Sequence, residues 1–287
     1  MSEQAVEEAV RQPRAFEALY EHWERHQWSP LEIDLTADKA AAATLTEDER
    51  EGMIWIFAHR FHAEWNVASL LAPFLLAAPD YDMQLLLATQ VADEYRHIQS
   101  VVRVFTEVFG IEGGVPAVKA LCDEHLDPVA ETFYAALDNM VRPLETTRDE
   151  DLFLQSVIAY HLIAEGSIGR ANQTLVVNRF KALDAYPGLQ EMQHLAILDE
   201  FRHIGIGVSY ARRRLERDRE QASALIGAVV DIFTGLGSQL LAGAGVDLAP
   251  RFVAVYGAEP EVIWQEVLRQ LELRLRAAGY EASLVAA

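Results

Sequence analysis

Two copies of one short motif give the chain residues that suit metal binding. The motif reads DEYRH around Glu94 and His97, and DEFRH around Glu200 and His203. Residues three apart on a helix are surface neighbours, so each Glu-x-x-His pair shares one face. Apolar residues flank both pairs at helical spacing, so we expect both pairs to point into a core. A carboxylate and an imidazole held together there can bind one metal ion.

Two more glutamates lie in similarly apolar helical stretches. Glu64 shares a face with Phe61, and Glu165 shares one with Leu162. Four buried carboxylates would repel one another and protonate, but two divalent cations would neutralise their combined charge. The set matches the ligand pattern of ferritin-like dimetal proteins, in which two helices each supply a Glu and two supply a Glu-x-x-His. The predicted metal ligands are Glu64, Glu94, His97, Glu165, Glu200 and His203.

Iron and manganese suit these oxygen and imidazole ligands, although ligand type alone leaves zinc open. The alternative is that four unrelated acids and two histidines lie on solvated helix faces. Asp93 and Asp199 directly precede the motif glutamates. They could orient the histidines, as carboxylates beside metal-bound imidazoles do, or they could face solvent. The motif arginines, Arg96 and Arg202, are expected to point outward and balance charge.

Helices must position these residues, because helical periodicity dominates and the sequence holds no convincing series of alternating strands with hairpin turns. An all-α fold is therefore predicted. Thr46 and Glu49 form a capping box at the start of the first long helix, and Pro73 should kink its last part. The expected helices span 46–78, 81–109, 117–143 with a potential break near Pro128, 149–184, 188–218, 221–242 and 260–278.

No Pro/Gly/Ser-rich linker divides the chain, so residues 1–287 are interpreted as one domain. Its predicted parts are an irregular lead-in (1–45), the metal-binding helices (46–218) and accessory helices (219–287).

The amino-acid composition excludes several classes of function. The chain has a formal charge of −20 and 51% hydrophobic residues, so it can bury a core but should not bind nucleic acid or anionic membranes non-specifically. Cys122 is the only cysteine, and MSEQAVEEAV lacks the basic and apolar regions of a secretory signal. Charged residues interrupt the apolar stretches before about 18 positions, so no membrane-spanning helix is expected. A cytoplasmic protein is predicted.

Over about residues 15–215 the chain resembles the ribonucleotide-reductase small-subunit superfamily, and most closely its ligand-binding oxidases with a Mn/Fe or di-iron centre. The most specific piece outside the ligands is WSPLEIDLTADK at 28–39, which is similar to the family's N-terminal W-x-P-x-E-I/V-D-x-S/T-x-D-R/K segment. In the family this Trp joins a path to the metal through the Asp of the last motif. The resemblance thus gives Trp28 and Asp199 that role, with plain packing as the alternative for Trp28.

The resemblance also disfavours a reductase role. The reductase's radical tyrosine lies four residues after the first ligand His, where this chain has Val101, and the first ligand is Glu64 rather than Asp. In the oxidase branch, a Val and a Tyr joined by an ether bond occupy the positions of Val67 and Tyr160, and Pro73 matches a family proline. Helix geometry alone places Tyr160 about 140° around from Glu165, so an ordinary buried tyrosine is the alternative.

Other polar residues near the ligands have less specific roles. Arylamine N-oxygenases carry a seventh ligand His where this chain has Ala196, so the match to that branch is poor. His161 lies one turn before Glu165 and could reach metal or substrate, while His194 is expected in the outer surroundings or exposed. Arg60 should bridge to a buried acid rather than to an anionic substrate. Small residues that could leave room for a substrate chain are Gly169, Ala196 and Gly207.

The resemblance implies a dioxygen-activating oxidase or monooxygenase that holds two metal ions, Fe/Fe or Mn/Fe, and removes hydrogen from a C–H or O–H bond. Its implied partners are dioxygen, a small or fatty-acid-like organic ligand, an electron donor and a second copy in a homodimer. The alternatives are a reductase-like radical protein, an N-oxygenase and a non-catalytic iron-binding ferritin-like protein.

Overall fold

The computed structural model describes residues 16–241 and 257–284. Every regular element in these two ranges is helical, and neither range contains a strand. The predicted all-α fold is therefore confirmed for them. The N-terminal stretch MSEQAVEEAV, expected to lack a secretory signal, lies outside the described residues, as does residue 242 at the end of one expected helix.

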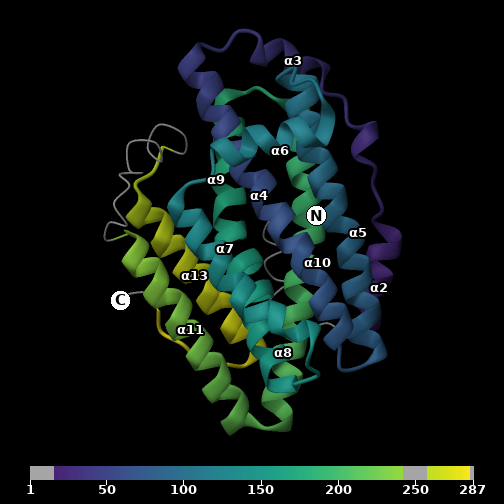
Figure 1. Ribbon diagram of the computed structural model, residues 1–287, viewed down its shortest axis with the longest axis vertical. Coiled ribbons are helices and arrows are strands. Elements are labelled where there is room, and N and C mark those ends of the chain that lie inside the picture. The colour runs from purple at the N-terminus through teal and green to yellow at the C-terminus, as the bar shows by residue number, and fades with distance from the viewer. Residues whose placement is uncertain (1–15, 242–256, 285–287) are drawn as a thin grey trace.

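Four long helical segments build the bundle that carries the motifs (Figure 1). They are α4 (Glu47–Ala77), α5 (Tyr81–Arg103), the continuous run α8 (Glu150–Val157), η4 (Ile158–Gly169) and α9 (Arg170–Leu183), and α10 (Pro187–Arg217). These are the four segments predicted to hold the ligands, with ends shifted by one or two residues at most positions. Helix α5 continues into a short π-helix, η2 (Val104–Val108), before the left-handed turn at Gly110.

Local contacts fix where these helices begin. Thr46 and Glu49 form the predicted capping box, with the Thr46 hydroxyl accepting from the Glu49 amide. The buried Asp38 carboxylate accepts from the amides of Gly188 and Leu189 at 3.0 and 2.9 Å. Two free amides at the start of α10 are thereby satisfied. The WSPLEIDLTADK segment thus anchors the helix that carries the second motif.

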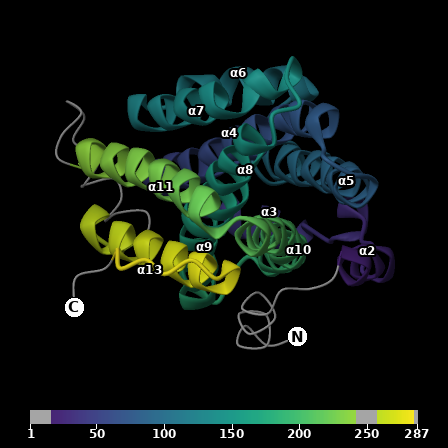
Figure 2. The ribbon, with the colours of Figure 1, turned by 90° about the horizontal axis from the view of Figure 1, so that it is seen from below.

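The other helices surround this bundle, as Figure 2 shows from one end. The lead-in is more regular than predicted, because α2 (Phe16–Arg25), η1 (Pro30–Glu32) and α3 (Thr36–Ala42) are helical. The expected helix at 117–143 is two helices, α6 (Gly114–Glu124) and α7 (Pro128–Val141), followed by η3 (Arg142–Glu145). The break falls at Asp127, whose side chain caps α7 by accepting hydrogen bonds from its first amides. Pro128 is the first residue of α7, a position that proline favours.

The last two helices cover the third segment of the bundle. They are α11 (Arg219–Leu241) and α13 (Pro260–Ala278), and both pack against η4. Their buried side chains, among them Ile226, Phe233 and Leu271, join the same apolar cluster as Tyr160. The helices after residue 218, which had no assigned role in the sequence, therefore close one side of the bundle.

The segment η4 departs from the expected α-helix. Its twelve residues form a π-helix, and at its end the Arg170 backbone N–H donates to the carbonyl of Glu165, five residues earlier. A π-helix bonds residue i to i+5 and is frequently found at functional sites. Residues five apart, such as Tyr160 and Glu165, are therefore about one turn apart here.

Two helical stretches are long and apolar enough to cross a membrane by length and composition alone, Glu150–Ala182 and Arg219–Gln239. The prediction that none would meet this criterion was wrong, because isolated charges do not lower the average of a long helix enough. In the first stretch 78% of the apolar window is buried inside the protein, against 28% in the second. The 78% burial of the first stretch is typical of a core helix of a helical bundle.

Candidate dimetal centre

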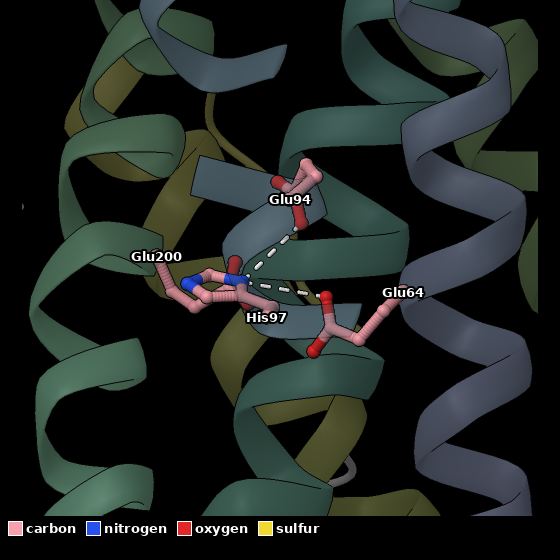
Figure 3. A group of neighbouring side chains, drawn as sticks. All are labelled: Glu64, Glu94, His97 and Glu200. Atoms are coloured by element: carbon pink, nitrogen blue, oxygen red, sulfur yellow. Dashed lines mark ion pairs between the residues drawn. The ribbon is translucent and has the colours of Figure 1, made fainter. Parts of the chain in front are cut away.

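The six residues predicted as metal ligands meet in the middle of the bundle. Helix α4 supplies Glu64, α5 supplies Glu94 and His97, η4 supplies Glu165, and α10 supplies the remaining two. None of the six is more than 8% exposed. Figure 3 shows four of them, Glu64, Glu94, His97 and Glu200, converging from three helices.

The six side chains divide into two overlapping groups whose donor atoms all lie within 4.8 Å of one another. Two carboxylates, Glu94 and Glu200, belong to both groups. Each group thus offers one imidazole, one carboxylate of its own and two shared carboxylates, which is a ligand set for two adjacent cations. The groups are Glu64, Glu94, His97 and Glu200, and Glu94, Glu165, Glu200 and His203.

Both imidazoles turn the same nitrogen toward the carboxylates. Nδ1 of His97 lies 3.4 Å from Glu64 Oε2 and 3.3 Å from Glu94 Oε2. Nδ1 of His203 lies 3.0 Å from Glu94 Oε1. The inward nitrogen is the one that would bind a cation, provided that Nε2 carries the proton.

The two aspartates face the outer nitrogens and cross between the motif copies. Asp199 Oδ2 lies 3.2 Å from Nε2 of His97, and Asp93 Oδ2 lies 3.2 Å from Nε2 of His203. A carboxylate in this position fixes the tautomer of a metal-binding imidazole and raises its basicity. The structure thus places both aspartates where orientation of the histidines requires them, and neither faces solvent.

Unpaired atoms at the centre fit bound cations. Buried polar atoms almost always have a hydrogen-bond partner. In the described part of the chain, five potential metal-binding atoms of this cluster have no hydrogen-bond partner. They are Glu94 Oε2, Glu165 Oε2, Glu200 Oε2, His97 Nδ1 and His203 Nδ1. Their convergence on one place agrees with a two-cation site.

Burial and neighbouring charges shift the pKa values of the clustered carboxylates and imidazoles in different directions. Burial raises the pKa values of Glu64 and Glu165, the latter well above its usual range with further help from the charge of Glu94. Burial opposes ionisation of Glu94 too, but His203 and His97 hold its pKa well below the usual range. The surrounding carboxylates in turn raise the pKa values of both imidazoles against the effect of burial. Divalent cations would supply the positive charge that this group of acids needs.

Two further side chains contact the carboxylates. The Arg60 guanidinium lies 2.5 Å from Glu64 Oε1 and 3.8 Å from Glu200 Oε1, so it bridges to a buried acid as expected. Gln90, which the sequence interpretation did not single out, donates to Glu165 Oε1 at 2.9 Å. Its position one turn before Glu94 on the same face was the signal available in the sequence.

His161 lies beside the centre rather than in it. Its Nε2 is 3.1 Å from Gln90 Oε1, and Gln90 separates it from Glu165. The side chain is fully buried. Burial lowers the pKa of His161 to about 3, so the ring is neutral near pH 7. His194 is exposed.

The pitch of η4 brings Tyr160 toward the first ligand helix. The Tyr160 hydroxyl donates to the backbone carbonyl of Val67 at 3.2 Å. The angular separation of 140° from Glu165, expected for an α-helix, was wrong because these residues lie one turn apart in a π-helix. Burial, followed by the charge of Glu165, raises the pKa of the Tyr160 phenol well above its usual range.

Both motif arginines point inward, contrary to the prediction. Arg202 is 3% exposed and donates to Asp93 Oδ2 at 2.5 Å and to Thr89 Oγ1 at 2.9 Å. Arg96 donates to Asp93 Oδ1 at 2.9 Å and to Asp199 Oδ2 at 3.3 Å. Buried aspartates require a positive partner, and these arginines provide it.

The expectation that small residues leave room for a substrate chain was wrong for Gly207. A Cβ at Gly207 would meet the His161 Cβ at 2.4 Å and Leu162 Cδ1 at 2.8 Å. A Cβ at Gly169 would lie 3.2 Å from the Ala164 carbonyl oxygen of its own segment, so for Gly169 and Ala196 the expectation stays a prediction. Gly207 therefore allows α10 to approach η4 closely instead of opening space.

The predicted path residue Trp28 contacts its predicted partner. Its indole Nε1 donates to Asp199 Oδ2 at 2.7 Å, and its ring stacks at 6.3 Å from that of His97. The half-buried indole thus connects the protein surface to an inward-facing imidazole through one carboxylate.

No protein-family model matches the chain. Solved structures match it closely, among them three variants of an R2-like ligand-binding oxidase with a reconstituted Mn/Fe cofactor. A valine-to-alanine variant has a TM-score of 0.78 at 19% identity, and a tyrosine-to-phenylalanine variant has 0.78 at 20%. A glycine-to-phenylalanine variant has 0.75 at 20%. Each match covers 92% of this chain and 93% of the matched chain. The chain therefore has the all-α, ferritin-like fold of the R2-like ligand-binding oxidases.

Proposed function

We propose that this chain is a dioxygen-activating oxidase with a dimetal-carboxylate centre, Fe/Fe or Mn/Fe. The observation that carries the proposal is the pair of overlapping four-residue groups that share Glu94 and Glu200. The fold supports it, because the similar structures belong to oxidases named as holding a Mn/Fe cofactor.

The proposal gives each ligand a place. One cation would be held by Glu64 and His97, the other by Glu165 and His203, with two glutamates shared between them. When bound, such a metal pair would supply the electrons that reduce dioxygen and the oxidising power that removes hydrogen from a substrate.

The remaining residues of the centre position and insulate it. Asp93 and Asp199 hold the proton of each imidazole on Nε2, which leaves Nδ1 free to bind. Arg60 compensates the charge of Glu64, and Gln90 fixes the orientation of Glu165. The dry apolar surroundings strengthen all of these interactions.

The same centre could join Val67 to Tyr160. Formation of the ether would break one C–H bond of Val67 and the phenolic O–H bond, and would form one C–O bond. The two electrons and two protons that are released would go to dioxygen. The contact between the Tyr160 hydroxyl and the Val67 carbonyl supports this proposal because it places the phenol at residue 67. The monooxygenase type remains a proposal alongside the oxidase.

The substrate and the partners are proposed on the resemblance alone. They are a small or fatty-acid-like organic ligand, an external electron donor and a second copy of the chain in a homodimer. A cytoplasmic location is proposed from the single cysteine, Cys122, which leaves no intrachain disulfide possible.

Metal analysis tests the function. Protein prepared with iron and manganese at low zinc should contain iron or manganese at both positions and change its near-ultraviolet absorption when the reduced form meets dioxygen. Glu191→Gln, an exposed substitution on α10, is the control and should behave as the unaltered chain. Less than about one such metal per chain, half of what a two-cation site holds, without an oxygen-dependent change, would rule the proposal out.

A further inference from the structure

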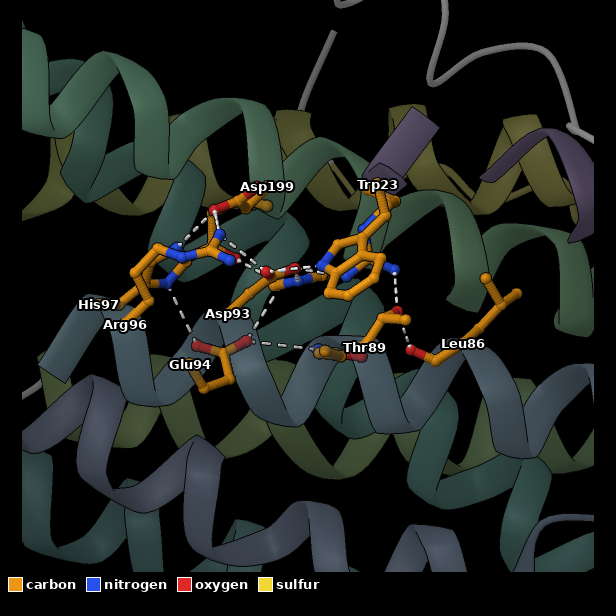
Figure 4. A network of polar contacts seen from close by, with 12 residues as sticks. Trp23, Leu86, Thr89, Asp93, Glu94, Arg96, His97 and Asp199 are labelled. Carbon is orange, nitrogen blue, oxygen red and sulfur yellow. Dashed lines mark hydrogen bonds and ion pairs between the residues drawn. The ribbon is translucent and has the colours of Figure 1, made fainter. Parts of the chain in front are cut away.

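A second tryptophan, Trp23, donates a hydrogen bond to Asp93, just as Trp28 donates one to Asp199. The Trp23 indole Nε1 donates to Asp93 Oδ1 at 2.9 Å, and Asp93 Oδ2 lies 3.2 Å from Nε2 of His203. Figure 4 shows Trp23 and Asp93 within one polar network that continues to Asp199. The molecule therefore contains two Trp–Asp–His chains, one ending at each inward-facing imidazole.

Both chains begin at the same part of the protein surface. Trp23 lies in α2 and Trp28 follows it by five residues, and both side chains are half-buried. The ring of Tyr20, also half-buried, stacks on that of Trp23 with centroids 6.1 Å apart. Each indole is thus partly exposed and hydrogen-bonded to an aspartate through its Nε1.

The inner part of the second chain is firmly held. Asp93 is fully buried and accepts from Trp23, Arg96 and Arg202, besides lying beside His203. Arg96 also reaches Asp199 at 3.3 Å, so the two chains are joined at the level of their carboxylates. Three donors on one carboxylate hold Asp93 in place, which keeps its distances to Trp23 and His203 short.

We propose that Trp23, Asp93 and His203 form a second electron-transfer path from the surface to the dimetal centre. The inference rests on the proposed function, which includes an external electron donor that returns the oxidised metal ions to the reduced state. Every link from the Trp23 indole to His203 is covalent or a short polar contact, so an electron can tunnel along it without oxidising the indole. One electron leaves a reduced donor of the flavoprotein or iron–sulfur class, and one ferric ion becomes ferrous. No bond forms or breaks along the path.

Stopped-flow reduction of the iron-loaded full chain tests the path. Dithionite serves as the one-electron donor, and the loss of ferric absorption is followed. With two parallel paths of similar efficiency, Trp28→Phe should leave about half of the rate, and adding Trp23→Phe should lower the remainder at least about fivefold, a non-additive result. If the double variant is reduced as fast as Trp28→Phe, the inference is overturned.

Trp65→Phe is the matched control, because Trp65 is also partly exposed and its ring stacks on that of Phe61, away from both Trp–Asp–His chains. Its reduction rate should equal that of the unaltered chain. One further variant in the Trp28→Phe background tests the hydrogen-bonded link itself. Trp23→His keeps an N–H donor for Asp93 and should retain more of the rate than Trp23→Phe, which removes that hydrogen bond. The reverse order would overturn the inference.

Titration of the metal-free variants with Co²⁺ gives a readout that is independent of turnover. Trp23→Phe should bind as many Co²⁺ ions as the unaltered chain, and a loss of one ion would show a structural role instead. If the unaltered chain takes up no iron, the proposed function and the path fail together. If it takes up iron and reacts with dioxygen while Trp23→Phe has no effect in either background, the path alone fails.

Discussion

Asp93 lies 3.2 Å from the imidazole of His203, a residue of the other motif copy, and Asp199 lies at the same distance from His97. The repeated DExRH motif therefore works as a crossed pair, in which each copy supplies a Glu-x-x-His unit and the carboxylate that orients its counterpart. Neither copy is complete alone. Helices α5 and α10 must be in register before either imidazole can be fixed.

Loss of one orienting carboxylate should weaken metal binding without removing a ligand. Asp199→Asn would remove the charge that holds the proton on Nε2 of His97, and we expect metal affinity to fall about 10- to 100-fold. Calorimetric titration with Mn²⁺ or Co²⁺ measures it, with Glu191→Gln on the same helix as the control. An affinity equal to that of the control would show that Asp199 does not support the site.

The ether bond between Val67 and Tyr160 can be followed by mass. After reconstitution with iron and exposure to dioxygen, the peptide pair that contains these two residues should appear joined and lighter by two hydrogens. Tyr160→Phe removes the phenolic oxygen and should abolish the product, as should reconstitution without dioxygen. Unjoined peptides from the unaltered, oxygen-exposed protein would contradict the ether bond.

Much of this arrangement could be predicted from the sequence, because helix spacing places Glu94 beside His97 and Glu200 beside His203 whatever lies around them. The six ligands and the main helices followed from local patterns of this kind. The π-helix at η4 could not be predicted, because its side chains from Ile158 to Ser167 are all buried and no solvent-facing side marks its pitch in the sequence.

Contacts between distant residues also lay beyond the sequence. Arg96 and Arg202 were expected in solvent, since charged side chains are rarely buried, and only the fold shows that Asp93 pairs with both. The contact of Trp23 with Asp93 joins residues seventy apart, and no local spacing signals it. The sharing of Glu94 between the two cation positions is likewise a property of the assembled bundle.

His161 should make the metal-free protein sensitive to acid. Its pKa of about 3 lies below the usual value of 6.5, so the unfolded chain binds the extra proton first as the pH falls. Its contribution is present above pH 6.5 and is lost on acidification toward pH 3. His161→Gln, which keeps a donor for Gln90, should flatten the fall of unfolding free energy between pH 6 and 4 by up to about 1.4 kcal/mol per pH unit. Urea unfolding at each pH measures the slope, and identical slopes would contradict the assignment.

The single cysteine should be inert in the native protein. Cys122 is fully buried, and burial raises the pKa of its thiol to about 12. Because only the thiolate is alkylated, iodoacetamide at pH 8 should label the folded chain far more slowly than the chain unfolded in guanidinium chloride. Equal labelling rates would place Cys122 at the surface.

Metal stoichiometry in two ligand variants tests the shared-ligand centre most directly. The metal-free chain should bind two Co²⁺ ions. Glu165→Ala removes a ligand that belongs to one group only, so one tight ion should remain. Glu94→Ala removes a ligand of both groups, so both ions should bind weakly or not at all. If both variants retain two tight ions, or if the unaltered chain binds none, the six residues do not form a dimetal centre.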